Sequence, residues 1–314
     1  MVITNVHVYI VIFTSVVPYV TTANHNAIRR DVISHPNWKL LERNVDCGKT
    51  DNYRIVGGDN ARLGQYPWIA RLIYKRKIDN KMRNVSECGG TIISEKYILT
   101  AAHCGPRRMG IPLISVRLGE HRIYTNPDCD RRVCAPPVQD IQVEEHKCHE
   151  NYDRFVRQND ICLLRMASPI RFNDFVSPIC LPVYEIFQRI AYEGKTLEVA
   201  GWGIRDIFLK RGSSILQTIM VKISNHRQCV EMYKNKGMMI SSNQICAGGI
   251  IGKDSCNGDS GGPLMAPISV ESPPKYFIIG VVSFGPTYCA DTDMPGVYTM
   301  VSDYVLWILN NIRE

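Results

Sequence analysis

Three short segments of this chain carry residue types that could together cleave an acyl bond. Ser260 lies in the run Cys-Asn-Gly-Asp-Ser-Gly-Gly-Pro, where small residues let the backbone turn sharply and leave amide N–H groups free for an oxyanion. A neutral serine needs a base, and the base needs a group that orients it. His103, in Thr-Ala-Ala-His-Cys, and Asp160, in Asn-Asp-Ile-Cys-Leu-Leu, supply both. Each residue alone is typical of a turn or a packed side chain, but the three together predict acyl transfer.

These residues need a scaffold, and the hydrophobic pattern predicts one made of strands. Short apolar runs at 68–73, 92–99, 197–200 and 276–282 alternate with turns rich in Gly, Pro and Asn, which is typical of an all-β barrel protein. Residues 301–312 have apolar positions at helical spacing and predict a terminal amphipathic helix. A length of 314 residues with 45% hydrophobic residues permits a large core.

The composition limits the compartment and the class of partner. The net charge of +7 is modest and includes no Lys/Arg block that would follow a phosphate backbone, so we expect no nucleic-acid partner. Twelve cysteines without a CxxC pair favour disulfides in an oxidising compartment over a metal site. The interrupted apolar run 6–20 is too short to span a membrane, which takes about 20 residues, and is typical of a signal-peptide core. We therefore expect a secreted protein without a membrane anchor.

With these segments in view, the chain resembles the trypsin-like serine proteases of the chymotrypsin fold. The resemblance covers residues 55–314. Besides the three segments above, it rests on Arg54-Ile55-Val56-Gly57-Gly58, Pro67-Trp68, Cys88-Gly89-Gly90, Pro178-Ile179-Cys180-Leu181-Pro182, Gly201-Trp202-Gly203, Ser283-Phe284-Gly285 and Pro295-Gly296-Val297-Tyr298. It implies an all-β fold of two six-stranded antiparallel β-barrels, with the active site in the cleft between them and a C-terminal α-helix. It also implies a protease domain at 55–314 and a propeptide or light chain at 24–54, which follows the signal peptide that the apolar run predicts at 1–23.

The resemblance assigns a role to each residue of the three segments. Ser260 attacks the scissile carbonyl, and His103 takes the serine proton and returns it to the leaving amine. Asp160 holds the imidazole tautomer and stabilises the imidazolium. The backbone N–H groups of Gly258 and Ser260 form the oxyanion hole.

Four further residues match the substrate-binding pocket of the family. Asp254 lies at the position of the pocket floor, Gly285 and Gly296 match its two walls, and Ser283 is a further substrate-binding position. A carboxylate at the bottom of a narrow cleft is costly unless a substrate cation neutralises it. The alternative for Asp254 is a solvated loop acid beside a lysine. The matching positions together predict cleavage after Arg or Lys.

The chain also resembles a zymogen. Cleavage after Arg54 would free the α-amino group of Ile55, which in the family turns inward and pairs with the aspartate before the nucleophile, here Asp259. That pairing would order the loop that carries the oxyanion donor, so the uncut chain should be inactive. Because the cut follows an arginine, we expect the activator to be another trypsin-like protease.

The family pattern suggests how the cysteines pair. It implies Cys47–Cys180, Cys88–Cys104, Cys229–Cys246 and Cys256–Cys289, with Cys47–Cys180 retaining the light chain after cleavage. Cys129–Cys134 would close a small loop that resembles the protease domains of arthropod clip-domain serine proteases, and Cys148 and Cys162 are left for each other. A clip module has six cysteines, whereas residues 1–46 contain none. We expect either that the module is absent or that the sequence comes from a truncated gene model.

Three secondary features have weaker sequence signals. Asn84 begins a glycosylation sequon. The loop 74–83 holds five basic residues, which indicate either a solvated face or an exosite that steers acidic substrate segments. No cofactor is required, but Glu120, Asp128 and Glu145 surround a loop that binds calcium in some relatives, and carboxylates suit Ca²⁺.

The leading hypothesis is a secreted, monomeric serine endopeptidase zymogen of an extracellular cascade. The resemblance places such relatives in immunity, melanisation or development, with protein substrates, an upstream protease and serpin-type inhibitors as partners. One alternative is a non-catalytic homologue that acts as a binding cofactor, although such proteins usually lose a triad member. Another is a digestive trypsin, against which the Cys47 tether and the small Cys129–Cys134 loop argue.

Overall fold

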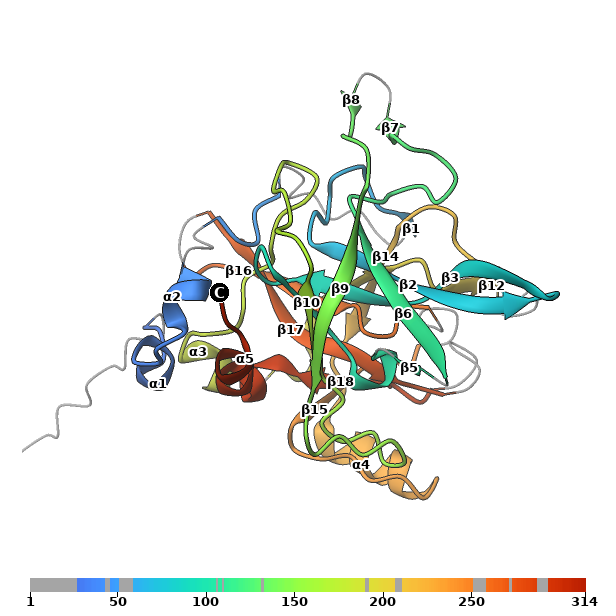
Figure 1. Ribbon diagram of the computed structural model, residues 1–314. Coiled ribbons are helices and arrows are strands. Elements are labelled where there is room, and N and C mark those ends of the chain that lie inside the picture. Colours follow the sequence, from blue (N-terminus) through green and yellow to red (C-terminus); the bar gives the residue numbers. More distant parts are fainter. Residues whose placement is uncertain are drawn as a thin grey trace, which may run out of the picture.

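The protein was analysed as a computed structural model (Figure 1). The structure describes residues 27–42, 46–50, 59–105, 107–108, 110–130, 133–189, 192–206, 211–250, 258–270, 273–286 and 293–314. The expected signal peptide, Arg54, Ile55, Asp254, Cys256 and Cys289 lie outside these ranges. Within them, no helix is both long enough and apolar enough to cross a membrane.

The first barrel is a closed ring of antiparallel strands. Its order is β2 (Ile69–Ile78), β3 (Lys81–Ile92), β4 (Tyr97–Thr100), β10 (Cys162–Met166), β9 (Gln139–Cys148) and β6 (Ile111–Leu118), with β5 (Arg107–Arg108) beside β6. A ladder between β6 and β2 closes the ring. Leu72, Ile98 and Leu164 are fully buried at its centre. The apolar run 92–99 ends one strand, turns at 93–96 and begins the next.

The second barrel is closed less completely. Its sheet has the order β1 (Asp59–Asn60), β14 (Gln217–Lys222), β11 (Thr196–Gly201), β16 (Pro263–Ile268), β17 (Lys275–Phe284), β18 (Gly296–Met300) and β15 (Gln244–Ala247). Its open side is joined by an isolated bridge between Ile223 and Ala247. Two short hairpins, β7 (Cys129–Asp130) with β8 (Val133–Cys134) and β12 (Ile204–Asp206) with β13 (Arg211–Gly212), lie outside both barrels. The predicted all-β, two-barrel fold is confirmed.

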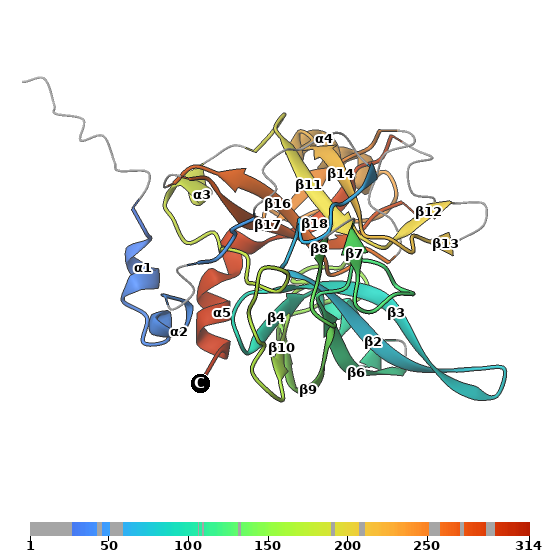
Figure 2. The ribbon, with the colours of Figure 1, turned by 90° about the horizontal axis from the view of Figure 1, so that it is seen from above.

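The helices are short and lie at the periphery of the barrels (Figure 2). They are α1 (Arg30–Ile33), α2 (Trp38–Glu42), η1 (Ala102–Cys104), α3 (Ile186–Arg189), α4 (His226–Lys234), η2 (Val301–Tyr304) and α5 (Val305–Asn311). The expected terminal helix is present, with a 3₁₀ first turn followed by an α-helical part. It buries Val305 and Ile308 completely, as the spacing predicts.

The N-terminal segment packs against this terminal helix. Figure 2 shows α1 and α2 beside α5. The Asn37 side chain donates to the carbonyl oxygens of Leu309 and Ile312, both at 2.9 Å, and caps the end of α5. Arg29, 7% exposed, donates to the Ser302 carbonyl at 3.0 Å. The segment before the expected cleavage site is therefore attached by packing as well as by a disulfide.

Five of the six expected disulfides lie in the described part of the chain, and all five are present. They are Cys47–Cys180, Cys88–Cys104, Cys129–Cys134, Cys148–Cys162 and Cys229–Cys246. Beside the first bond, Gly48 has φ 65°, and an added Cβ would lie 2.3 Å from the Tyr276 carbonyl oxygen, so only glycine fits there.

Candidate active site

Strand register brings His103 and Asp160 to the same end of the first barrel. In the antiparallel pair of β4 and β10, Thr100 lies opposite Cys162. His103 follows Thr100 by three residues, and Asp160 precedes Cys162 by two, so both emerge at one edge. The disulfide from Cys162 to Cys148 ties the Asp160 strand to β9.

Asp160 holds His103 through two hydrogen bonds. The backbone N–H of His103 donates to Asp160 Oδ1 at 2.8 Å, and Nδ1 of the ring lies 2.7 Å from Oδ2. A carboxylate at Nδ1 favours the tautomer with its proton there, which leaves the lone pair of Nε2 available as a base. Asp160 is completely buried. Burial opposes its ionisation, but the charge of His103 and the hydrogen bonds from His103 and Ser283 hold the pKa of Asp160 below its usual value.

Two residues of the second barrel complete the environment of Asp160. The hydroxyl of Ser283, on β17, donates to Asp160 Oδ2, and the Thr299 hydroxyl, on β18, donates to the Asp160 carbonyl at 3.0 Å. Ser283 was predicted as a substrate-binding residue, which stays a prediction, and its side chain binds the Asp160 carboxylate. Thr299 was not predicted at all. Its only sequence signal is a hydroxyl residue within the apolar strand β18, where it is 1% exposed.

The loop around Ser260 is packed against the strand end that leads to His103. The Ser260 carbonyl accepts from Gly89 N–H at 2.8 Å. Gly261 has φ 79°, and an added Cβ would lie 2.2 Å from Thr100 Oγ1. Glycine is therefore required for this close approach. In the described part of the chain no hydrogen bond joins Ser260 to His103, whose Nε2 lies 3.5 Å from Cys104 Sγ.

Asp259, next to the serine, lies in a cradle made by two glycines. Its Oδ1 accepts from Gly203 N–H at 2.8 Å. A Cβ added to Gly201 would lie 2.1 Å from Oδ1, and one added to Gly203 would lie 2.3 Å from Oδ2. Gly258 has φ 108°, and its added Cβ would lie 2.9 Å from Gly203 Cα. The Gly-Trp-Gly motif thus makes room for this carboxylate.

The two predicted wall glycines of the substrate pocket are neighbours in space. A Cβ added to Gly285 would meet Gly296 Cα at 3.6 Å, because Phe284 pairs with Val297 in the ladder between β17 and β18. Asp254, the predicted floor, lies outside the described residues. The predicted preference for Arg or Lys therefore remains a prediction.

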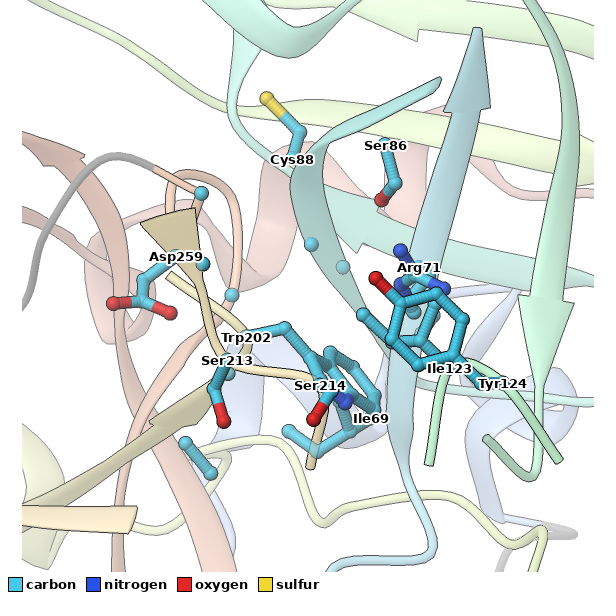
Figure 3. Close-up of a pocket in the computed structure, with 18 residues that line it drawn as sticks. Ile69, Arg71, Ser86, Cys88, Ile123, Tyr124, Trp202, Ser213, Ser214 and Asp259 are labelled. Atoms are coloured by element: carbon cyan, nitrogen blue, oxygen red, sulfur yellow. The ribbon is translucent and has the colours of Figure 1, made fainter. Parts of the chain in front are cut away.

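A cavity of about 290 Å³ lies beside the Ser260 loop (Figure 3). Gly258, Asp259, Trp202, Arg71 and Tyr124 are among the residues that line it. Together these come from both barrels and from the loop after β6. The three predicted residues of the substrate pocket, Ser283, Gly285 and Gly296, do not line this cavity.

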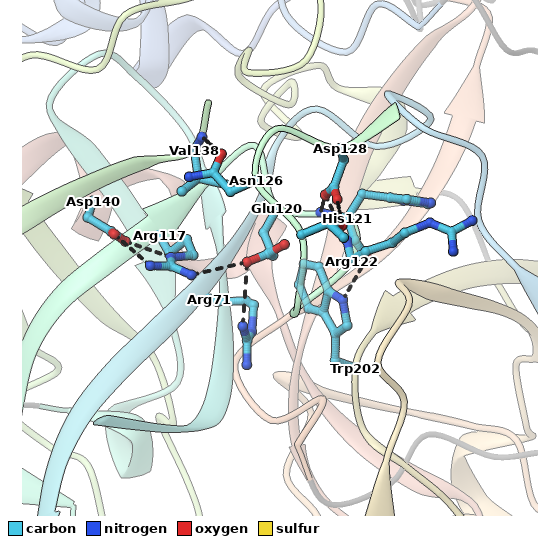
Figure 4. A network of polar contacts seen from close by, with 11 residues as sticks. Arg71, Arg117, Glu120, His121, Arg122, Asn126, Asp128, Val138, Asp140 and Trp202 are labelled. Carbon is cyan, nitrogen blue, oxygen red and sulfur yellow. Dashed lines mark hydrogen bonds and ion pairs between the residues drawn. The ribbon is translucent and has the colours of Figure 1, made fainter. Parts of the chain in front are cut away.

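The three carboxylates predicted as calcium ligands each have a partner of their own, and Figure 4 shows those of Glu120 and Asp128. Glu120 pairs with Arg117 at 3.3 Å and Arg71 at 3.7 Å. Burial raises the pKa of Glu120 above its usual value, although the two arginines oppose this shift. Asp128 accepts from the backbone N–H groups of residues 121 and 122 at 2.9 and 2.8 Å. Glu145 pairs with Arg313. The three acids do not meet as a set in the structure, and calcium binding stays a prediction.

The part of the chain that the structure describes contains one cluster with three potential metal-ligand atoms, formed by Cys88, His103 and Cys104. The two cysteines are joined in a disulfide, so their sulfur atoms are not available as thiolates. Asn84 of the predicted glycosylation sequon is exposed on β3.

Comparisons with known proteins agree with this geometry. Residues 55–308 match the family model described as Trypsin. The chain belongs to the trypsin family. This trypsin-family chain is 41% identical over 283 residues to the CLIP domain-containing serine protease HP8 of Bombyx mori, with 88% of this chain and 74% of the relative covered. It is 38% identical to the Spaetzle-processing enzyme of Drosophila melanogaster, with 87% and 70% covered.

Among solved structures, the trypsin-family chain is similar to the Drosophila Grass clip serine protease of the Toll pathway. The TM-score is 0.73 and the sequence identity is 37%, with 86% of this chain and 76% of that chain covered. The predicted resemblance to arthropod clip-domain serine proteases is confirmed.

Proposed function

We propose that this chain is a secreted serine endopeptidase zymogen which, once cut after Arg54, hydrolyses peptide bonds after Arg or Lys. The observation that carries the proposal is the hydrogen bond between the buried Asp160 carboxylate and His103 Nδ1, which leaves the lone pair of Nε2 available as a base. The packing of the Ser260 loop onto the strand end before His103 supports it.

The proposed reaction is acyl transfer through Ser260. Its Oγ forms a bond to the scissile carbonyl carbon while its proton passes to His103 Nε2. The C–N bond then breaks, and the same proton goes to the leaving amine. Water, deprotonated by His103, hydrolyses the acyl-enzyme and restores the serine. The N–H groups of Gly258 and Ser260 would hold the oxyanion.

Activation would work through Asp259. The Ile55 ammonium released by cleavage would pair with this carboxylate in the cradle of Gly201 and Gly203. An α-amino group has a pKa of about 7.7 to 8, so its charge, and with it the active form, should be lost at higher pH. The pairing would stabilise the conformation of the loop that carries the Gly258 donor.

Substrate preference would come from Asp254 at the end of a slot walled by Gly285 and Gly296. The contact between these two glycines supports the slot, because neither places a side chain in it. A guanidinium or ammonium group would neutralise the buried acid.

The biological setting we propose is an extracellular cascade of innate immunity, melanisation or development. The support is the similarity to clip-domain proteases, including one named for processing another protein. In such a cascade an upstream trypsin-like protease would cut after Arg54, and serpin-type inhibitors would stop the active monomer. The Cys47–Cys180 bond and the packing of Asn37 on α5 would retain the light chain after cleavage.

We also propose glycosylation at Asn84 and calcium binding near Glu120. Glycosylation at Asn84 would suit its exposed position, and a mass shift on deglycosylation would test it. Calcium binding near Glu120 would require the acid to exchange its arginine partners for the ion. Isothermal titration of the chain with Ca²⁺ would test it.

Labelling with a fluorophosphonate tests the catalytic proposal directly. We expect label on the Arg54-cleaved chain, none on its Ser260→Ala variant and little on the uncut Arg54→Gln variant. Absence of label from the cleaved wild-type chain would contradict catalysis and favour a non-catalytic binding cofactor. Cleavage of a wide panel of Arg peptides at similar rates would favour a digestive trypsin.

A further inference from the structure

Strands β2 and β3 extend beyond the first barrel as a paired hairpin, which we name the basic hairpin (residues 75–84). Figures 1 and 2 show that it projects away from both barrels. Its pairing runs without interruption from Lys75 opposite Asn84 to Ile78 opposite Lys81. The two turn residues, 79 and 80, have φ 49° and 60°, as in the two-residue turns that match the twist of paired strands. The predicted loop at 74–83 is therefore a preorganised β-hairpin.

The basic hairpin concentrates positive charge and contains little negative charge of its own. Its five exposed cations are Lys75, Arg76, Lys77, Lys81 and Arg83, and its one acid is Asp79. Arg76 pairs with Glu87, but the other four cations have no ion pair among the described residues. Arg76 also lies directly opposite Arg83, and like charges at such positions destabilise a strand pair. The excess of positive charge makes the hairpin complementary to an anionic partner.

The base of the hairpin lies at the cavity beside Ser260. Two parts of the paired strands line this cavity. They are residues 69–71 at the start of β2 and Ser86, Cys88, Gly89 and Gly90 in the later part of β3. Gly89 also donates to the Ser260 carbonyl. The described residues proposed to bind the substrate before the cut do not line the cavity, which leaves it available for the chain after the cut. A substrate that continues from the cavity along β3 reaches the hairpin.

Arg71, the cation inside the cavity, is already engaged by the protein. Its guanidinium pairs with Glu120 and lies over the Trp202 ring at 5.4 Å. It belongs to a group in which Arg117 pairs with Asp140 as well as Glu120, so positive and negative charges balance (Figure 4). The uncompensated charge therefore belongs to the hairpin.

We propose that the basic hairpin binds an acidic segment of the protein substrate, located after the cut bond; the proposal rests on the function proposed above. At about 3.3 Å per residue, Asn84 and Lys81 lie roughly 17 and 26 Å along β3 from Gly89. Acidic residues about five to eight positions after the cut would meet the cations. Met82, 55% exposed at the tip, offers apolar contact, which a polypeptide uses better than a sulfated polysaccharide does.

The test compares two peptides that differ only in the segment after a single Arg cut. One has Glu and the other Gln at about the fifth to eighth positions. Each kcat/KM is divided by that of the same enzyme on a short Arg ester without residues after the cut, using the chain cleaved at Arg54. The hairpin variant is Lys77→Glu with Lys81→Glu. The control is Lys234→Glu with Lys236→Glu, an equal charge change on exposed residues at and beyond the end of α4.

We expect the wild type and the control to favour the Glu peptide about tenfold at low ionic strength, and less as salt is added. The hairpin variant should lose this preference. Equal rates for the two peptides in the wild type, or a preference that survives in the hairpin variant, would overturn the proposal. The proposal would also be overturned if the hairpin were needed for retention on immobilised heparin while the enzyme cleaved the two peptides at equal rates. If the wild type does not cleave the short ester, the proposed protease function has failed instead.

Discussion

The two barrels contribute to the candidate site in different ways. The first barrel is closed by ladders on all sides and holds His103 on Asp160 through two hydrogen bonds, with disulfides beside both residues. The second barrel is joined across its open side by an isolated bridge and carries Ser260 on a loop in which Gly258 and Gly261 have positive φ. The proposed base is thus held in a rigid frame, whereas the proposed nucleophile lies on a loop next to Asp259, whose pairing we propose to change on activation. This division suits a zymogen, because a change on the Ser260 side can control activity while the base stays in place.

Asp160→Asn tests the rigid half and should have the largest effect. The amide would donate to Nδ1 and favour the wrong imidazole tautomer, so we expect kcat on a short Arg ester to fall about 10⁴-fold, the size associated with this change in Ser-His-Asp triads. The chain should still fold, because the two side chains have similar shapes. A loss of less than tenfold would show that Asp160 does not orient a catalytic base.

Gly203→Ala tests the adjustable half. The new methyl group would meet Asp259 Oδ2 at 2.3 Å and displace the carboxylate. We expect kcat of the Arg54-cleaved chain to fall about 10²- to 10³-fold, the cost of losing one oxyanion donor. Circular dichroism should show an unchanged fold. Full activity would mean that the site does not depend on the cradle.

Removal of the Cys148–Cys162 bond probes the rigidity of the first barrel. The bond joins residues 14 apart in sequence, and the loss of such a cross-link costs about 3 kcal/mol in the free energy of unfolding. We expect a urea titration of the Cys148→Ala, Cys162→Ala variant to show this loss. The matched variant without Cys129–Cys134, which closes a loop of separation 5, should lose less. Equal losses would contradict the expectation that the bond between β9 and β10 stabilises the fold more than the bond of the small outer loop does.

Glu198→Gln should have the smallest effect of these substitutions, and its effect on the free energy of unfolding should depend on pH. Glu198 is fully buried on β11 and accepts from the hydroxyls of Tyr66 and Tyr276 at 2.7 and 3.1 Å. Burial raises its pKa, so the folded chain retains a proton that the unfolded chain loses near pH 4.3. The wild type therefore loses stability relative to the variant as the pH rises from about 4 towards the folded-state pKa.

We expect the variant to be more stable at pH 7 by on the order of 1 kcal/mol and equal to the wild type below pH 4. Thermal unfolding at several pH values measures the difference. A gap that does not change with pH would show that ionisation of Glu198 is not involved.

The amino-acid sequence was enough to predict the fold and to select the candidate triad residues, and the family resemblance supplied the pairing of the five described disulfides. It could do so because each depends on local motifs: the small residues around Ser260, the apolar run before His103, and the cysteine positions within family segments. Register then followed from strand pairing, as with Thr100 opposite Cys162.

Only the tertiary structure decided which distant groups complete these motifs. Ser283 and Thr299 reach Asp160 across 123 and 139 residues of sequence, and Asn37 caps α5 from 272 residues away. Glu120 was predicted as a calcium ligand, and in the structure its carboxylate forms ion pairs with Arg71 and Arg117. Local spacing carries no signal for such contacts, because they form where the two barrels and the N-terminal segment pack together and most buried polar groups are hydrogen-bonded.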